Sequence, residues 1–164
     1  MKKALFPGTF DPPSLGHLDV IKRATQICDK LIIGIAVNAS KEKESFTPQE
    51  KIAMLQAITK GIEHIEIACF SRLVVDYAKE HQVDFLVRGL RAFSDFEYEF
   101  RMALANRKIS GIETVFLMAD ERYAHVSSTL IRELSLYNSR LHDFVPEAIE
   151  AQVFERLSPS KNPL

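Results

Sequence analysis

"LFPGTFDPPSLGH", Leu5 to His17, is the stretch in which an apolar run stops at a Pro-Gly pair and regular structure resumes at a Gly-His pair. A plain strand-to-helix connection needs only a few residues and a cap. This one also carries hydroxyl, carboxylate and imidazole groups, which is typical of a binding loop. Ser14 can cap the following helix, whose first N–H groups and dipole favour an anion, and we expect His17 to add a donor there. The alternative is a capped turn with a surface histidine.

Outward from this loop, short apolar runs alternate with segments of helical periodicity. Strands are expected at residues 3–7, 30–37, 65–70, 84–90 and 113–118, and helices at 15–27, 47–58, 72–81, 95–109, 127–137 and 146–157. Strands that alternate with helices form βαβ units with right-handed crossovers. The predicted fold class is therefore α/β: a single-domain, Rossmann-like, doubly wound five-stranded parallel sheet with helices on both faces.

Length and composition limit the class of protein. A chain of 164 residues with 26% charged residues and a formal net charge of −1 is an ordinary globular domain, without the basic field of a nucleic-acid coat. No apolar run approaches the roughly 20 residues of a membrane span. The N-terminal apolar run stops at Pro7, before the roughly 7–15 residues of a signal peptide core. We expect a cytoplasmic protein with no nucleic-acid or membrane partner.

Two further expectations concern the ends of the domain and the cysteines. Residues 1–157 are expected to form the domain, and residues 158–164 a disordered tail. Cys28 and Cys69 each lie in an apolar stretch without a CxxC pattern, so both are interpreted as reduced core residues rather than as a disulfide.

Phosphate-binding groups follow two of the predicted strands. Arg88 and Arg91 lie on either side of Gly89 and Leu90 where the fourth strand ends, and arginine recognises phosphate in a bidentate manner. If strands one and four are neighbours, these arginines face the His17 loop, because ligands bind at the carboxyl ends of parallel strands. Three consecutive hydroxyl residues, at 127–129, begin the helix after strand five. The alternatives are solvated charges and plain helix capping.

The remaining polar segments give weaker signals. The mixed charges of "NASKEKESF", residues 38–46, favour a solvated loop. The aromatic residues of 93–100 are expected to pack, while Glu97 or Glu99 is expected to pair with an arginine or to contact a ribose hydroxyl. The histidines and cysteines are scattered without the spacing of metal ligands, so no metal site from protein side chains is expected. A divalent ion would arrive with a nucleotide.

In combination, three segments resemble a known superfamily. "GTFDPPSLGH" is similar to the first signature of the nucleotidylyltransferases, a [HT]-x-G-H element, and "VSSTLIRE" to their second. With "RGLRAFSDFEYEF", "ATQICDKLIIGIA" and the length of the chain, the sequence resembles the bacterial phosphopantetheine adenylyltransferases from Ala4 to about Leu157. It departs from them at Ser14, where threonine is usual, and in a slightly longer "KEKES" loop, which leaves open whether Lys41 or Lys43 is the phosphate-binding lysine.

The resemblance implies a reaction and a set of site residues. The reaction is transfer of the adenylyl group of ATP to 4′-phosphopantetheine, which gives dephospho-coenzyme A and pyrophosphate, with Mg²⁺ accompanying ATP. The implied catalytic residues are His17, as a transition-state stabiliser, Lys41 and Arg91. The implied substrate-binding residues are Thr9, Lys41, Val74 and Arg88. The implied ATP-binding residues are Thr9, Phe10, His17, Gly89, Leu90, Arg91, Glu99, Tyr123, Ala124, His125, Val126, Ser127, Ser128 and Thr129.

The resemblance also implies a homohexamer that coenzyme A inhibits by feedback. Two other functions remain open from the residues. A sister enzyme, such as a nicotinate-mononucleotide adenylyltransferase or a cytidylyltransferase, would keep the first and last motifs. A non-catalytic nucleotide-binding module on the same fold is the other, because fold alone does not fix function.

Overall fold

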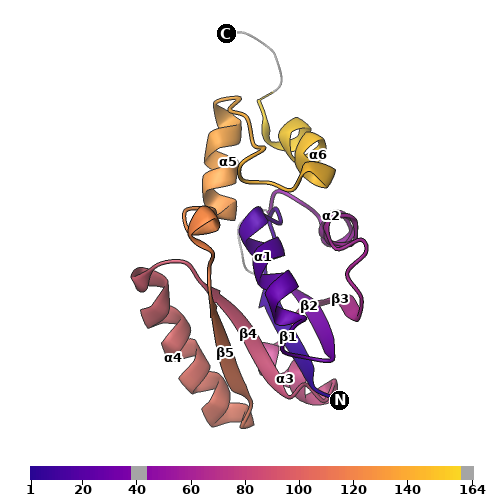
Figure 1. The fold of residues 1–164 in the computed structure, drawn as a ribbon, viewed down its shortest axis with the longest axis vertical. Helices are drawn as coiled ribbons and strands as arrows, with labels where there is room; N and C mark the ends of the chain where they lie inside the picture. Colours follow the sequence, from indigo (N-terminus) through magenta and orange to yellow (C-terminus); the bar gives the residue numbers. More distant parts are fainter. Residues whose placement is uncertain (38–43, 160–164) are drawn as a thin grey trace.

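The computed structural model describes residues 1–37 and 44–159. In the described residues, one sheet of parallel strands has the order β3-β2-β1-β4-β5 (Figure 1). The strands are β1 Lys3–Gly8, β2 Lys30–Ala36, β3 Ile65–Phe70, β4 Phe85–Leu90 and β5 Glu113–Met118. The α-helices are α1 Leu15–Ala24, α2 Pro48–Ile58, α3 Val74–Glu80, α4 Phe93–Ser110, α5 Ser128–Leu136 and α6 Glu147–Leu157, and a 3₁₀ turn covers Glu121–Tyr123. The predicted fold class is confirmed.

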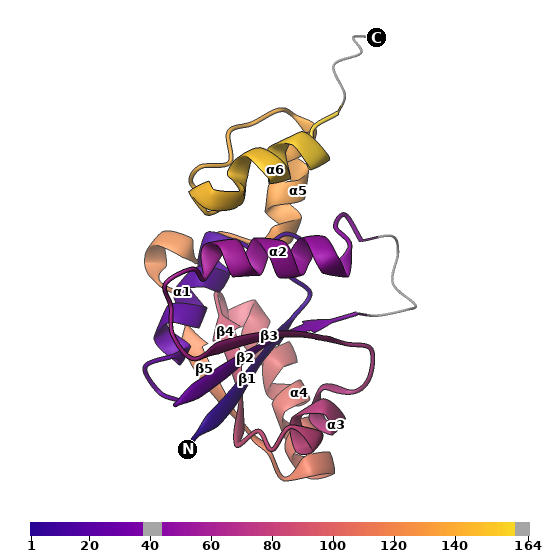
Figure 2. The same cartoon turned by 90° about the vertical axis from the view of Figure 1, so that its right-hand side faces the viewer.

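The two faces of the sheet carry separate apolar cores. Ala4 and Phe6 of β1 face a core formed with α1, α2, α5 and α6, whereas Leu5 faces a second core formed with α3. This alternation follows from the two-residue period of a strand. Figure 2 shows α2 on one side of the sheet and α3 on the other. Among the described residues, no helix combines the length and apolar character needed to cross a bilayer.

Two helices that cover the sheet begin at residues whose types favour capping. Ser14 caps α1, where its side chain accepts a hydrogen bond from the backbone N–H of His17. Thr47 caps α2 in a capping box with Glu50, and Pro48 occupies the first helical position. These contacts lie within one turn of the chain, so local sequence is sufficient to specify them.

β1 and β4 are neighbours only over their first residues. The register pairs Ala4 with Phe85 and Leu5 with Leu86, and then the ladder between the two strands ends. Pro7 follows and has no N–H with which to continue it. The strands therefore separate at their carboxyl ends, at the point where the strand order reverses. This is where ligands bind in open α/β sheets.

Two expectations about burial are wrong. Cys69 is exposed rather than part of the core, because β3 is an edge strand with solvent along one side. Cys28 is partly buried, and both thiols are free, as expected. The aromatic residues of α4 are not packed in the interior either. No residue of α4 is buried, and Phe93 is 90% and Tyr98 65% exposed. Among the described residues, α4 makes its main contacts with β4, β5 and α3, and much of its surface is left uncovered.

Candidate active site

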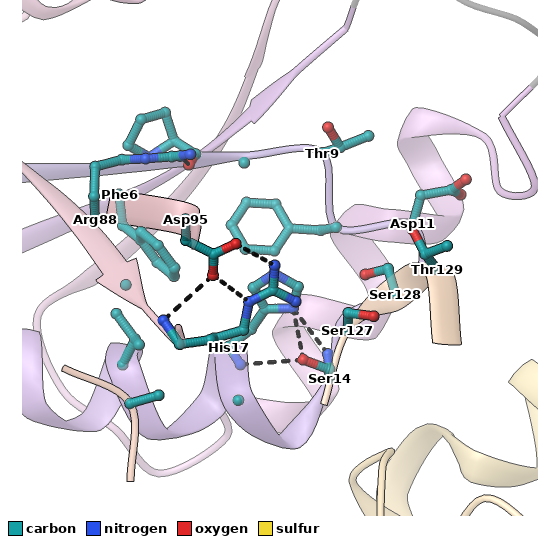
Figure 3. Close-up of a pocket in the computed structure, with 18 of the residues that line it drawn as sticks. Phe6, Thr9, Asp11, Ser14, His17, Arg88, Asp95, Ser127, Ser128 and Thr129 are labelled. Carbon is teal, nitrogen blue, oxygen red and sulfur yellow. Dashed lines mark hydrogen bonds and ion pairs between the residues drawn. The ribbon is translucent and has the colours of Figure 1, made fainter. Parts of the chain in front are cut away.

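A cavity of about 1000 Å³ opens between the diverging ends of β1 and β4. Its walls come from the loop after β1, the start of α1, the end of β4, α4, and the start of α5 (Figure 3). The lining includes residues from the three segments that the sequence predicted to bind a ligand, namely 8–17, 88–91 and 127–129. Elements that are far apart in the sequence thus meet at the carboxyl ends of the central strands.

His17 lies at the third position of α1 and completes an unusual capping box. Its Nδ1 atom is 3.0 Å from the backbone N of Ser14 and 3.0 Å from the Oγ atom of Ser14. A backbone N–H can only donate, so Nδ1 accepts and carries no proton. The proton of the neutral ring is therefore on Nε2, on the other side of the imidazole. Ser14 fixes both the orientation and the tautomer of His17, which presents an N–H donor in the wall of the cavity.

The surroundings of His17 keep it neutral. Its ring packs beside Phe10, with ring centroids 4.9 Å apart, and near Phe6. Burial, and after it the positive charges of Arg91 and Arg88, lower the pKa of His17 to about 4. The imidazole can therefore donate a hydrogen bond without being charged at neutral pH, but it is not poised to accept a proton.

Arg88 is held in place by an acid and by a backbone carbonyl. Its Nε atom donates to Oε2 of Glu99 at 2.7 Å, a second guanidinium nitrogen bonds Oε1, and a third donates to the carbonyl of Pro7 at 2.5 Å. The guanidinium thus bridges the gap between β4 and β1. The expectation that Glu97 or Glu99 pairs with an arginine is confirmed for both, since Glu97 pairs with Arg101 on the exposed side of α4.

Arg91 points toward the start of α5. Its Nε atom donates to Oδ2 of Asp95 at 3.1 Å, and its Nη1 atom donates to the carbonyl of Val126 at 3.3 Å. Arg88 and Arg91 therefore lie on different sides of the cavity, one toward β1 and α4 and the other toward α5. A ligand that spans the cavity meets one guanidinium on each side.

The three hydroxyl residues at the start of α5 have three different partners. Ser127 caps the helix by accepting from the backbone N–H of Leu130 at 3.0 Å. Ser128 donates to the carbonyl of Pro12 at 2.7 Å, which ties α5 to the loop after β1. Thr129 accepts from Arg132 at 3.2 Å. Plain capping therefore explains only Ser127, whereas Ser128 joins two walls of the cavity and Thr129 contacts a residue of its own helix.

The cavity brings together most of the predicted site residues. Those that line it are Thr9, Phe10, His17, Arg88, Gly89, Arg91, Glu99, Ser127, Ser128 and Thr129. Val74, Leu90 and residues 123–126 do not line it, so their contacts with a ligand remain predictions. Val74 packs against the second core, and the carbonyl of Val126 accepts from Arg91. Lys41 and Lys43 lie outside the described residues.

Several residues of the cavity wall had no predicted role in binding or catalysis. Asp11 and Arg132 are two of these, and Ser14 was proposed only as a cap. Arg132 lies within the second signature, "VSSTLIRE", where its charge beside three hydroxyl residues could have marked it. Asp11 gives no comparable local signal, because its partners are distant in the sequence.

The acidic groups in the cavity wall are already paired with cations. Glu99 binds Arg88, Asp95 binds Arg91, and Glu44 binds Lys51. Within residues 1–37 and 44–159 no three histidine, cysteine or acidic side chains form a group that could hold a metal ion. The cavity therefore presents hydrogen-bond donors and positive charge, which suits a ligand with several phosphate groups.

Comparison with known proteins gives similarities of three kinds: to a family profile, to curated relatives and to a solved structure. The profile of the family described as "Cytidylyltransferase-like" matches residues 5–134. A phosphopantetheine adenylyltransferase of Clostridium botulinum (strain Langeland) is 41% identical over 98% of both chains. One of Caldanaerobacter subterraneus is 40% identical over 98% of this chain and 100% of its own. A solved structure from Vibrio parahaemolyticus, described as a "Putative Nicotinate-nucleotide Adenylyltransferase", superposes on 93% of this chain and 99% of its own with a TM-score of 0.65. Its sequence identity is 16%, so this similarity supports the fold alone.

Proposed function

The chain belongs to the phosphopantetheine adenylyltransferases, within the cytidylyltransferase-like family, and we propose that its cavity joins ATP to 4′-phosphopantetheine. The products are dephospho-coenzyme A and pyrophosphate. The observation that carries the proposal is the neutral His17 at the start of α1. It donates into a cavity that Arg88, Arg91 and the start of α5 also line. The protein is an enzyme of coenzyme A biosynthesis.

The reaction needs charge stabilisation more than a covalent nucleophile. A phosphate oxygen of phosphopantetheine attacks the α-phosphorus of ATP, a P–O bond forms, and the bond to pyrophosphate breaks. Negative charge grows on the non-bridging oxygens of the α-phosphate in the transition state. A donor that is fixed beforehand meets this charge without reorganising. The Nε2–H group of His17, held by Ser14, supplies such a donor.

The two arginines divide the cavity between the substrates. Arg91 lies on the α5 side, where the first N–H groups of that helix and its hydroxyl residues suit the phosphates of ATP. Arg88 lies on the β1 side near Thr9, which suits the phosphate of phosphopantetheine. Glu99 holds Arg88 through both carboxylate oxygens, so we assign it the orientation of that guanidinium in addition to the predicted contact with ATP. Lys41 is proposed to bind the phosphate of phosphopantetheine.

Mg²⁺ is proposed to enter the cavity as a complex with ATP. The pairing of the cavity acids with arginine and lysine supports this, because those carboxylates are engaged elsewhere. The ion would then be held mainly by phosphate oxygens and water, as is usual for Mg²⁺ with nucleotides. Its chemical contribution would be to neutralise phosphate charge as pyrophosphate leaves.

Three further properties are proposed from the family resemblance. The first is assembly into a homohexamer, which is supported by exposed apolar side chains on α4 and β5, such as Phe93, Phe100 and Met118. The second is feedback inhibition by coenzyme A, whose pantetheine arm and adenine nucleotide resemble the two substrates joined together. The third is a cytoplasmic location. Light scattering of the purified protein and inhibition assays with coenzyme A test the first two.

The function is tested by release of pyrophosphate from ATP. We expect release to depend on phosphopantetheine and on Mg²⁺, and to be slow or absent when nicotinate mononucleotide replaces phosphopantetheine or CTP replaces ATP. Equal turnover with nicotinate mononucleotide would assign the chain to a sister enzyme instead. Binding of ATP without turnover of either acceptor would indicate a non-catalytic module.

A further inference from the structure

A buried charge cluster lies behind the cavity and has no part in the mechanism above. Lys51 of α2 is fully buried, and its ammonium nitrogen lies 2.6 Å from Oε2 of Glu44 and 3.9 Å from Oδ1 of Asp11. Lys51 does not line the cavity, whereas Glu44 and Asp11 do. Burial of charges is costly, and such a cluster contributes little to stability compared with apolar packing. Stability alone therefore does not account for the cluster.

Asp11 is one of the two residues of this cluster that line the cavity. Its two carboxylate oxygens accept hydrogen bonds from the backbone N–H groups of Ser45 and Phe46, each at 2.9 Å. Its carbonyl oxygen accepts from Nη1 of Arg132, and the same nitrogen lies 3.9 Å from Oδ2 of the carboxylate. Asp11 thus connects three segments: its carboxylate holds the segment before α2, and its main-chain carbonyl, with the carboxylate nearby, holds Arg132 of α5 to the loop after β1.

Arg132 is the cation of this network that lines the cavity. Its guanidinium lines the cavity, is about one third exposed, and lies beside the hydroxyl group of Thr129 at the start of α5. An arginine there needs a fixed direction, because a displacement of about 1 Å in a positioning group can reduce a rate by about 10²-fold. Asp11 supplies that direction through its main-chain carbonyl and through its carboxylate, which lies 3.9 Å from the same guanidinium nitrogen. The carboxylate is itself fixed by the two backbone donors, and the ammonium group of Lys51 lies 3.9 Å from it.

We infer that Asp11 is a positioning residue for adenylyl transfer that acts through Arg132, and that buried Lys51 is the counter-ion that keeps Asp11 in place. The inference rests on the proposed function, because it assigns Arg132 to the side of the cavity where that function places ATP. Arg132 would contact the phosphates of ATP, while Asp11 and Lys51 would not touch the substrate.

A double-mutant cycle tests whether Asp11 acts through Arg132. Asp11→Asn places an amide N–H against one of the two backbone donors, and we expect kcat/KM for ATP to fall about 10- to 100-fold at saturating phosphopantetheine. Arg132→Met should reduce it at least as much. The double variant should fall within about threefold of Arg132→Met alone, because a residue that acts only through Arg132 has nothing left to position. Multiplying effects, or an unchanged Asp11→Asn variant, would overturn the inference.

Variants of Lys51 separate positioning from simple stability. Lys51→Met removes the buried cation, and we expect kcat/KM for ATP to fall at least about fivefold, as the displaced Asp11 releases Arg132. Lys51→Gln, whose amide can still donate to Glu44, serves if the methionine variant does not fold. The matched control is Met54→Ala, a cavity variant at a buried residue of the same helix that does not line the site. Its melting temperature should fall while kcat/KM stays within about twofold.

The outcomes distinguish this inference from the proposed function. If the wild-type protein releases no phosphopantetheine-dependent pyrophosphate, the proposed function itself fails. If the wild type is active and the Lys51 variants lose only melting temperature, as Met54→Ala does, the cluster is structural and the positioning inference is wrong. Loss of kcat/KM in the Lys51 variants, with retention in Met54→Ala, supports it.

Discussion

Replacing His17 by alanine tests the central step of the mechanism. The variant loses the Nε2–H donor that the Ser14 backbone N–H orients from the other side of the ring. Removal of one fixed donor to a developing oxyanion typically lowers kcat by 10²–10³-fold, which corresponds to about 2.7–4 kcal/mol. The affinity for ATP should change far less, because Arg91 and the N–H groups at the helix starts still bind phosphate. The loss should therefore appear in kcat.

The same substitution has a separate and smaller cost in stability. The backbone N–H of Ser14 loses its acceptor, and the contact of the ring with Phe10 is lost. Loss of a helix cap costs about 1 kcal/mol, which lowers the melting temperature of a chain of this size by roughly 2–4 °C. Thr47→Ala is a matched control, because it removes the capping box of α2, which does not line the cavity. It should lower the melting temperature similarly and leave kcat unchanged.

The assay measures kcat for pyrophosphate release, the dissociation constant of ATP and the melting temperature on one preparation of each variant. His17→Gln, whose amide keeps one donor and one acceptor, should recover part of the lost kcat. A His17→Ala variant with near-normal kcat and a lowered melting temperature would refute the reasoning, since His17 would then serve only to cap and pack α1.

Three other predictions follow from the same geometry. Arg88→Ala should weaken phosphopantetheine binding more than ATP binding and Arg91→Ala the reverse, each by about 1.5–3 kcal/mol in calorimetric titrations; equal losses for both ligands would contradict the division of the cavity. Glu99→Gln should raise the KM for phosphopantetheine, because one hydrogen bond to Arg88 is lost while the arginine remains, and unchanged kinetics would mean that Arg88 needs no partner. Because the pKa of His17 is lowered from 6.5 to about 4, the unfolded state binds more protons between these values, so the free energy of unfolding should fall as pH decreases from about 6.5 to 4. Thermal melts across that range should show a shallower decrease for His17→Ala, and identical slopes would contradict the assigned pKa.

The sequence alone determined the features that depend on neighbouring residues. The capping groups Ser14 and Thr47 make contacts within one helical turn, so their residue types are sufficient to place the starts of α1 and α2. The alternation of apolar runs and helices predicts a parallel sheet, and the carboxyl ends of its strands then indicate where Arg88, Arg91 and His17 meet. Local pattern was therefore enough for the fold and for the centre of the site.

Only the tertiary structure decided burial and the partners of charged groups. Cys69 and Phe93 have apolar sequence neighbours, yet both are exposed, because their strand and helix lie at opposite edges of the sheet. The contacts of Asp11 with Phe46 and Arg132 span 35 and 121 residues of the chain. Such contacts form only when the sheet brings distant segments together, and their energy depends on distance and burial. Neither quantity is contained in the local sequence pattern.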